Sequence, residues 1–297
     1  MNLKQLINKG VEAVSGVYPE REAREMVFAF LEHSIGTRRH THIVEPEYQV
    51  KDADASVAMA AFERMASGEP LQYVTGVADF YGRQFRVTPA VLIPRPETEL
   101  LCREVLANRT NCQMLDPMSE SVRILDLCTG SGCIAWTLAL EMSGAEVTAV
   151  DISDGALEVA SSQDFAEEIA RTGALPPVFV KADVLAGPSE SGLAGQYDVL
   201  VSNPPYVMDK EKAVMRPNVL EHEPHLALFV PDDDPLVFYR AITRWALSLL
   251  KPDGFGIVEI NEALGPKTAE LFRGAGMRDV RVIRDLSERD RFVSFRR

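Results

Sequence analysis

The tetrapeptide Asn203-Pro204-Pro205-Tyr206 has the composition of a receptor for a planar group that carries an NH2. It follows residues 197–202, a hydrophobic run typical of a short buried strand. Proline has no N–H, so the proline carbonyls are acceptors without a donor beside them, while Asn203 adds a side-chain carbonyl and Tyr206 a flat ring. An amide or an exocyclic base amine fits such a loop. The alternative is an ordinary turn, because Asn and Pro are common turn formers.

A second segment, between a predicted strand and a predicted helix, contains Gly130 and Gly132. Glycines let the backbone approach a ligand closely. The pattern Gly130-x-Gly132-x-x-Ala135 matches the dinucleotide fingerprint, with Asp151 at the end of the next strand as the acid that binds ribose hydroxyls. With Asp126 before the glycines, the same residues match the first motif of S-adenosylmethionine (SAM) methyltransferases.

Residues further along the chain favour SAM over NAD. Asp183 follows the third predicted strand, where SAM methyltransferases hold the adenine amine, and the 203–206 loop follows the fourth strand, beside the methyl donor. A dehydrogenase gives that loop no role. A non-catalytic cofactor-binding scaffold, the third alternative, has no packing need for a complete receptor loop. The predicted cofactor is SAM, and the predicted cofactor-binding residues are Asp126, Cys128, Thr129, Gly130, Ser131, Gly132, Asp151, Ile152, Asp183, Val184 and Asn203.

These motifs must be positioned by an alternation of strands and helices that begins at Val122. We predict strands at residues 123–127, 146–151, 177–181, 197–202, 255–260, 280–284 and 292–295. Helical crossovers in the gaps predict a mostly parallel sheet covered on both faces. The link between the last two strands is too short for a parallel crossover, so they should pair as an antiparallel hairpin at one edge. The predicted fold class is α/β: a seven-stranded, Rossmann-like class I SAM-dependent methyltransferase.

The preceding part of the chain has a different character. Residues 1–75 predict a small helical, substrate-recognising domain, with helices at 19–31 and 53–66. Tyr73-Val74-Thr75 reads as strand-like, and residues 76–95 predict a β-hairpin linker. Residues 96–297 are then the catalytic domain.

Composition limits the partners. The chain has 297 residues and a net charge of −13, and acidic residues outnumber basic ones on both sides of residue 80. Because phosphate neutralisation supplies most nucleic-acid affinity, we expect no stable nucleic-acid partner. The absence of a secretory signal and of a long apolar run predicts a cytoplasmic protein without membrane contact. The four cysteines, which form no CxxC pair, predict reduced thiols and no metal site: Cys102, Cys112, Cys128 and Cys133.

From Gly68 to Arg297 the chain closely resembles the peptide-chain release factor glutamine N5-methyltransferases. The resemblance rests on these segments: Gly68-Glu69-Pro70-Leu71-Gln72-Tyr73, Ile93-Pro94-Arg95-Pro96-Glu97-Thr98-Glu99, residues 126–135, Val150-Asp151-Ile152-Ser153, Asn203-Pro204-Pro205-Tyr206, Glu223-Pro224-His225-Leu226-Ala227-Leu228, Asp285-Leu286 and Asp290-Arg291. It implies methyl transfer from SAM to the side-chain nitrogen of the glutamine in the Gly-Gly-Gln loop of class I release factors, which are the implied protein partners.

The resemblance also implies roles for the 203–206 loop as the substrate-binding and catalytic segment. The side-chain oxygen of Asn203 and the backbone oxygen of Pro204 accept the two amide N–H bonds, and Tyr206 packs on the amide plane. Pro205 completes the substrate-binding loop. Cys128 departs from the glycine common in this family and is more usual in a sibling family that methylates a large-subunit ribosomal protein.

Two other substrates stay open at this point. The ribosomal protein of the sibling family is one, although the Pro94-Arg95-Pro96-Glu97-Thr98 segment has the release-factor form. Nucleic-acid adenine N6 is the other, because its amine presents the same planar NH2; the acidic composition argues against it. Arg95, Glu97 and Thr98 either have a role near the cofactor or belong to a capped helix start, in which Thr98 and Glu97 satisfy the first turn.

Overall fold

The computed structural model describes residues 1–111 and 121–297, so Cys112 lies outside the described residues. The chain forms two compact units: Met1–Val77 with Met215–His222, and Ala78–Val214 with Glu223–Arg297. The return of residues 215–222 to the first unit is not signalled by the sequence. The roles expected for residues 1–75, 76–95 and 96–297 stay predictions.

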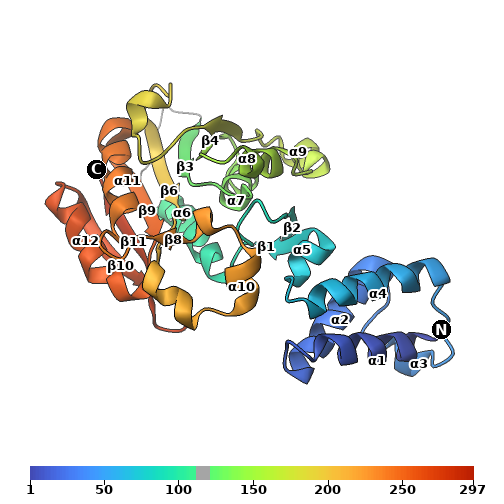
Figure 1. Ribbon diagram of the computed structural model, residues 1–297. Helices are drawn as coiled ribbons and strands as arrows, with labels where there is room; N and C mark the ends of the chain where they lie inside the picture. Colours follow the sequence, from blue (N-terminus) through green and yellow to red (C-terminus); the bar gives the residue numbers. More distant parts are fainter. Residues whose placement is uncertain (112–120) are drawn as a thin grey trace. The chain divides into compact units, whose positions relative to one another are not determined.

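The first unit is helical. Its helices are α1 (Leu3–Val14), α2 (Glu20–Ile35), α3 (Thr41–Val44), α4 (Asp52–Ala66), α5 (Leu71–Thr75) and α10 (Pro217–His222). Asn2 and Gln5 form a capping box that starts α1. A Cβ at Gly10 would lie 2.7 Å from the Phe62 ring, so this glycine lets α1 approach α4 closely. The buried side chains of α1, α2 and α4 form one core. Figure 1 shows these three helices grouped together.

The strand expected at Tyr73-Val74-Thr75 is wrong, because these residues form α5. The backbone N–H of Tyr73 donates to the carbonyl of Pro70 at 3.0 Å, and Gly76, with φ of +77°, ends the turn. Tyr73 is buried. Tertiary burial has therefore overridden the strand preference of three β-prone residues.

The second unit is built on a seven-stranded sheet with the order β10-β11-β9-β6-β3-β4-β5. Its strands are β3 (Val122–Leu127), β4 (Ala145–Asp151), β5 (Val178–Lys181), β6 (Tyr197–Ser202), β9 (Leu250–Glu259), β10 (Arg278–Arg284) and β11 (Asp290–Arg296). The central strands are parallel, while β11 is antiparallel to both β9 and β10. The predicted mostly parallel sheet with an antiparallel edge hairpin is confirmed.

Helices cover both faces of this sheet (Figure 1). The longer helices are α6 (Glu99–Asn111), α7 (Cys133–Glu141), α8 (Asp154–Ser161), α9 (Ala166–Thr172), α11 (Val237–Leu249) and α12 (Gly265–Gly274). Ile124 on β3 belongs to a core that includes Trp136 of α7, and its neighbour Leu125 belongs to a core with Trp245 of α11. Adjacent strand residues point to opposite faces, so the alternation divides the apolar side chains between two cores.

Short elements complete the unit. They are the hairpin strands β1 (Val77–Phe80) and β2 (Arg83–Arg86), the paired strands β7 (Val207–Met208) and β8 (Phe229–Val230), and the 3-10 turns η1 (Pro96–Thr98), η2 (Pro188–Glu190), η3 (Asp209–Val214), η4 (His225–Ala227) and η5 (Glu262–Leu264). In the described part of the chain, no helix is long and apolar enough to cross a membrane.

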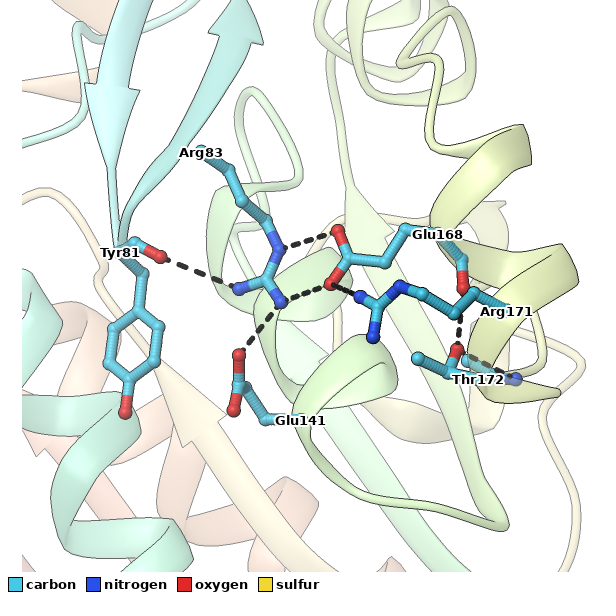
Figure 2. Close-up of polar contacts among 7 residues, drawn as sticks. Tyr81, Arg83, Glu141, Glu168, Arg171 and Thr172 are labelled. Carbon is cyan, nitrogen blue, oxygen red and sulfur yellow. Dashed lines mark hydrogen bonds and ion pairs between the residues drawn. The ribbon is translucent and has the colours of Figure 1, made fainter.

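An ion-pair network ties the β1–β2 hairpin to the helices beside the sheet (Figure 2). Arg83 donates to Glu168 of α9 at 3.0 Å and to Glu141 of α7 at 2.7 Å, and its side chain is only 13% exposed. The hydrogen bonds from Arg83 lower the pKa of Glu168. The hairpin aromatic rings of Phe80 and Phe85 enter the same core as α7. Charge pairing and apolar packing therefore hold the hairpin on this unit.

Candidate active site

Strands β3, β4 and β6 bring the predicted site segments to one edge of the sheet. Leu127 on β3 pairs with Val150 on β4 and with Ser202 on β6. Cys128 directly follows β3 and Asn203 directly follows β6, so both residues lie at the same edge of the sheet. This is the carboxyl edge of the parallel strands, where open α/β sheets bind ligands.

A cavity of about 330 Å³ lies at this edge, within the size range of small-molecule sites. Of the predicted site residues, those that line it are Cys128, Thr129, Gly130, Ser131, Asp151, Ile152, Asp183, Val184, Asn203 and Pro205. The other four do not contribute to the lining, namely Asp126, Gly132, Pro204 and Tyr206. The structure thus places ten of the fourteen predicted site residues around one cavity.

The glycine turn is held in a conformation that L-residues seldom adopt. Gly130 and Gly132 have φ of +54° and +79°. A Cβ at Gly132 would lie 3.0 Å from the Cβ of Ala160, whereas one at Gly130 would meet nothing within 4 Å. Gly132 therefore allows close helix packing, and Gly130 exposes its backbone to the cavity. Cys128 also has a positive φ, +62°, which suits glycine better than cysteine.

Asp126 lies beneath the turn and is fully buried. Its Oδ2 accepts from the Thr129 hydroxyl at 2.6 Å, and its Oδ1 makes no hydrogen bond among the described residues. Burial raises the pKa of Asp126 to about 7, although the Thr129 hydroxyl acts in the opposite direction. A buried acceptor without a donor is costly. Asp126 does not line the cavity, so its charge acts from beneath the glycine turn.

Two further carboxylates face the cavity from the ends of neighbouring strands. Asp151 accepts from the backbone N–H of Gly130 at 2.9 Å and from that of Ser153 at 3.0 Å. Burial raises the pKa of Asp151. Asp183 accepts from the backbone N–H of Leu185 at 2.8 Å. Each carboxylate is thus oriented by backbone N–H groups and keeps acceptor capacity for a ligand.

An ion pair joins two segments of the cavity wall. Arg95 lines the cavity and donates to Glu223 at 2.6 Å. The other oxygen of Glu223 accepts from the backbone N–H of Ile93 at 3.2 Å, and the Glu223 side chain is only 1% exposed. The residue after it, Pro224, lines the cavity too. Glu223 therefore fixes the spacing between the 91–95 segment and the 224–227 turn.

The 203–206 loop is oriented by hydrogen bonds from outside the loop. Asn203 donates from Nδ2 to the Thr98 hydroxyl at 3.3 Å. The Tyr206 hydroxyl donates to Glu259 Oε1 at 2.9 Å, and the backbone oxygen of Tyr206 accepts from Asn261 Nδ2 at 3.2 Å. Both ends of the loop are consequently fixed before any ligand arrives.

The open alternatives at the start of α6 can now be separated. No side-chain hydrogen bond caps the η1 turn, and the Thr98 hydroxyl donates to Glu259 Oε2 at 2.7 Å. Arg95 and Thr98 line the cavity, whereas Glu97 does not. The hydrogen bonds that the structure gives to the Thr98 hydroxyl are tertiary contacts, with Glu259 and Asn203.

Several residues of the site had no strong signal in the sequence. Gln163 accepts from the backbone N–H of Arg86 at 2.8 Å and donates to the backbone oxygen of Ser131 at 3.0 Å, which joins the hairpin to the glycine turn. No motif marks it. Glu259, by contrast, could have been predicted as a site residue, because it is a lone carboxylate in the hydrophobic run of a predicted central strand.

The residues around the cavity fit a SAM molecule. The open backbone at Gly130 and the two oriented carboxylates of Asp151 and Asp183 line the cavity and offer acceptors for a ligand with an ammonium, a ribose and an aromatic amine, while Asp126 lies beneath this lining. Among the described residues, no cluster of three or more His, Cys, Asp and Glu side chains has the arrangement of a metal site.

The strand order separates the two cofactor classes that share the glycine pattern. A dinucleotide-binding Rossmann sheet has the order 3-2-1-4-5-6. Here, the last strand of the chain, β11, is inserted antiparallel between β9 and β10. The fold and the site therefore define a Rossmann-like SAM-dependent methyltransferase.

Comparisons with known proteins agree with this class. Residues 106–225 match the model of the methyltransferase small domain, and residues 5–76 match that of the PrmC N-terminal domain. The solved hMettl16 catalytic domain, in complex with the MAT2A 3'UTR hairpin 6, covers 83% of this chain and 81% of its own with a TM-score of 0.53. Its 16% sequence identity shows a common fold alone.

Sequence relatives are more specific. The release factor glutamine methyltransferase of Bacteroides thetaiotaomicron is 43% identical over 79% of this chain and 78% of its own length. That of Flavobacterium psychrophilum is 33% identical over 99% of this chain and 98% of its own. The chain belongs to the release factor glutamine methyltransferase family. SAM is its methyl donor.

Proposed function

We propose that this enzyme methylates the side-chain nitrogen, N5, of the glutamine in the Gly-Gly-Gln loop of class I peptide chain release factors. The observation that carries the proposal is the fixed Asn203 amide on the wall of the cavity, with Nδ2 engaged by Thr98 and Oδ1 left as the acceptor. The names of the relatives supply the acceptor protein. A substrate that works in translation also implies a cytoplasmic enzyme.

The cofactor-binding residues divide by the part of SAM that they suit. Asp151 suits the ribose hydroxyls, since its oxygens are oriented by backbone donors. Asp183 and Val184 suit the adenine, and Ile152 lines the same region of the cavity. The glycine turn, with Asp126 beneath it, suits the amino acid end. When bound, SAM supplies an electrophilic methyl group on a sulfonium.

The 203–206 loop would position the glutamine. An amide nitrogen is a poor nucleophile because its lone pair is delocalised into the carbonyl, so orientation contributes much of the catalysis. The Oδ1 of Asn203 and the backbone oxygen of Pro204 accept the two N–H bonds, with Pro205 beside them. These acceptors also stabilise the positive charge that develops on the nitrogen. The nitrogen loses its proton after transfer, which requires no strong base.

Tyr206 is proposed to pack its ring on the substrate amide plane. Its hydroxyl donates to Glu259, and burial and the nearby Glu259 charge raise its pKa, so it stays a neutral phenol. A neutral ring held at its tip is suited to packing and not to proton transfer.

The decisive experiment is transfer of labelled methyl from SAM to a purified class I release factor, with a Gln→Ala change in the Gly-Gly-Gln loop as the control. We expect label on the wild-type factor alone. Label on both proteins would refute the glutamine as acceptor. Absence of label on the factor, with label on a large-subunit ribosomal protein or on DNA, would move the substrate to that class.

A further inference from the structure

A buried relay of hydrogen bonds connects Asn203 to the centre of the sheet. Asn203 Nδ2 donates to Thr98 Oγ1 at 3.3 Å, and Thr98 Oγ1 donates to Glu259 Oε2 at 2.7 Å. The second oxygen of Glu259 accepts from the Tyr206 hydroxyl at 2.9 Å. Thr98 and Glu259 are 2% and 1% exposed, so water does not compete for these bonds. One carboxylate thus holds both ends of the substrate loop.

The direction of each hydrogen bond follows from the chemistry of the carboxylate. Both oxygens of Glu259 accept from hydroxyl groups, and Thr98 directs its single proton to Oε2. The Thr98 oxygen can then only accept from Asn203, which turns the NH2 end of the amide toward Thr98. The carbonyl end is left for the ligand. If the amide were reversed, two acceptor oxygens would face each other across 3.3 Å, and an NH2 would face the substrate NH2.

We propose that Glu259 is a positioning residue that fixes, through Thr98, which end of the Asn203 amide faces the substrate. This proposal rests on the proposed function for its catalytic consequence, but the relay itself does not depend on the identity of the methyl acceptor. Thr98 belongs to the same relay and also lines the cavity, whereas Glu259 does not line it.

The surroundings of Glu259 support its role as an acceptor. Both of its side-chain oxygens are occupied by hydroxyl donors. Burial raises the pKa of Glu259, while these two hydroxyl groups and the charge of Arg291 act in the opposite direction. Arg291 is itself held by Asp285 at 2.9 Å. The Asp285 and Arg291 segment, remote in sequence from the substrate loop, thereby acts on the same carboxylate.

The main test uses Thr98→Val, which removes the hydroxyl at nearly constant volume. We expect kcat for methyl transfer to fall about tenfold, the size of one lost hydrogen bond. KM for SAM should change less than kcat does, because Val keeps the volume of Thr98 at the cavity wall. Thr98→Ser keeps the hydroxyl and should restore most of the rate. Thr243→Val is the matched control, because Thr243 is also buried and donates to a backbone oxygen, that of Tyr239, at 2.8 Å.

A double-mutant cycle tests whether Glu259 acts through Thr98. Glu259→Gln replaces one acceptor by a donor, so one of the two hydroxyl groups loses its partner. We expect each single variant to be slow and the Glu259→Gln, Thr98→Val double variant to be little slower than the slower single one. If the factors by which the two substitutions lower kcat multiply in the double variant, the relay is overturned. A folded Thr98→Val enzyme with the wild-type kcat would also overturn it.

A second readout is independent of the acceptor protein. The side-chain 15N amide resonances of Asn203, assigned by their loss in Asn203→Asp, should shift in Thr98→Val and in Glu259→Gln but not in Thr243→Val. Unchanged resonances in both relay variants would overturn the proposal. If wild-type enzyme transfers no methyl to the release factor, the proposed function fails, and these resonances still decide the relay.

Discussion

The buried carboxyl of Asp126 predicts an unusual dependence of stability on pH. Burial raises its pKa in the folded protein to about 7, from the usual value of 3.8. Between these values the folded state binds a proton more tightly than the unfolded state does. The free energy of unfolding therefore falls as pH rises from about 4 to about 7, and the loss is complete above that range. At about 1.4 kcal/mol for each pKa unit, the loss reaches at most about 4 kcal/mol.

Asp126→Asn removes this titration and keeps the shape of the side chain. We expect the variant to be more stable than the wild type at pH 8, with the difference shrinking toward pH 5. The assay is urea unfolding of both proteins, without SAM, at a series of pH values. Asp164→Asn, on an exposed side chain, controls for the change in net charge.

Parallel stability curves for the wild type and Asp126→Asn would refute this reasoning. They would mean that the carboxyl keeps an ordinary pKa, and hence that solvent or the backbone N–H of Ala135 stabilises its ionised form. A raised pKa also predicts that SAM binding by the wild type changes with pH in the same range, since a cationic ligand favours the ionised carboxylate.

Three further predictions follow from the site and the hairpin. Asn203→Ala should lower kcat by roughly 10²-fold, as for loss of one preorganised polar contact; a wild-type kcat at saturating release factor would exclude its role. Asp151→Ala should weaken SAM binding in calorimetry, and an unchanged dissociation constant would exclude the ribose contact. Arg83→Met should lower the free energy of unfolding by about 1 kcal/mol or more, because it leaves Glu141 and Glu168 facing each other. In Arg83→Met combined with Glu168→Gln, part of that loss should be regained, and no recovery would mean that lost packing dominates.

Local sequence patterns were sufficient to predict the strands of the second unit. Hydrophobic runs that end in Asp151 and Ser202 mark strands, because a parallel strand buried on both faces has few other compositions. The polar residues that follow such strands then fall at one edge of the sheet. The segment Tyr73-Val74-Thr75 shows where this reasoning fails: three residues are too few to carry a period, and burial decided their conformation.

Contacts between distant segments could not be predicted in this way. Thr98, Asn203 and Glu259 are separated by more than 50 residues from one another, and only the pairing of strands and the placement of η1 bring them together. A threonine at a helix start is compatible with a local cap, so its sequence context favours the wrong partner.

By itself, the sequence determined the class of fold, the cofactor and the family, and it predicted a substrate-binding role for the 203–206 loop, since each is encoded in short contiguous motifs. The tertiary structure decided how those motifs are oriented: the insertion of β11 between β9 and β10, the burial of Asp126, and the bonds that set the Asn203 amide. The physical reason is that burial and the direction of a hydrogen bond depend on neighbours in space, which a contiguous motif does not contain.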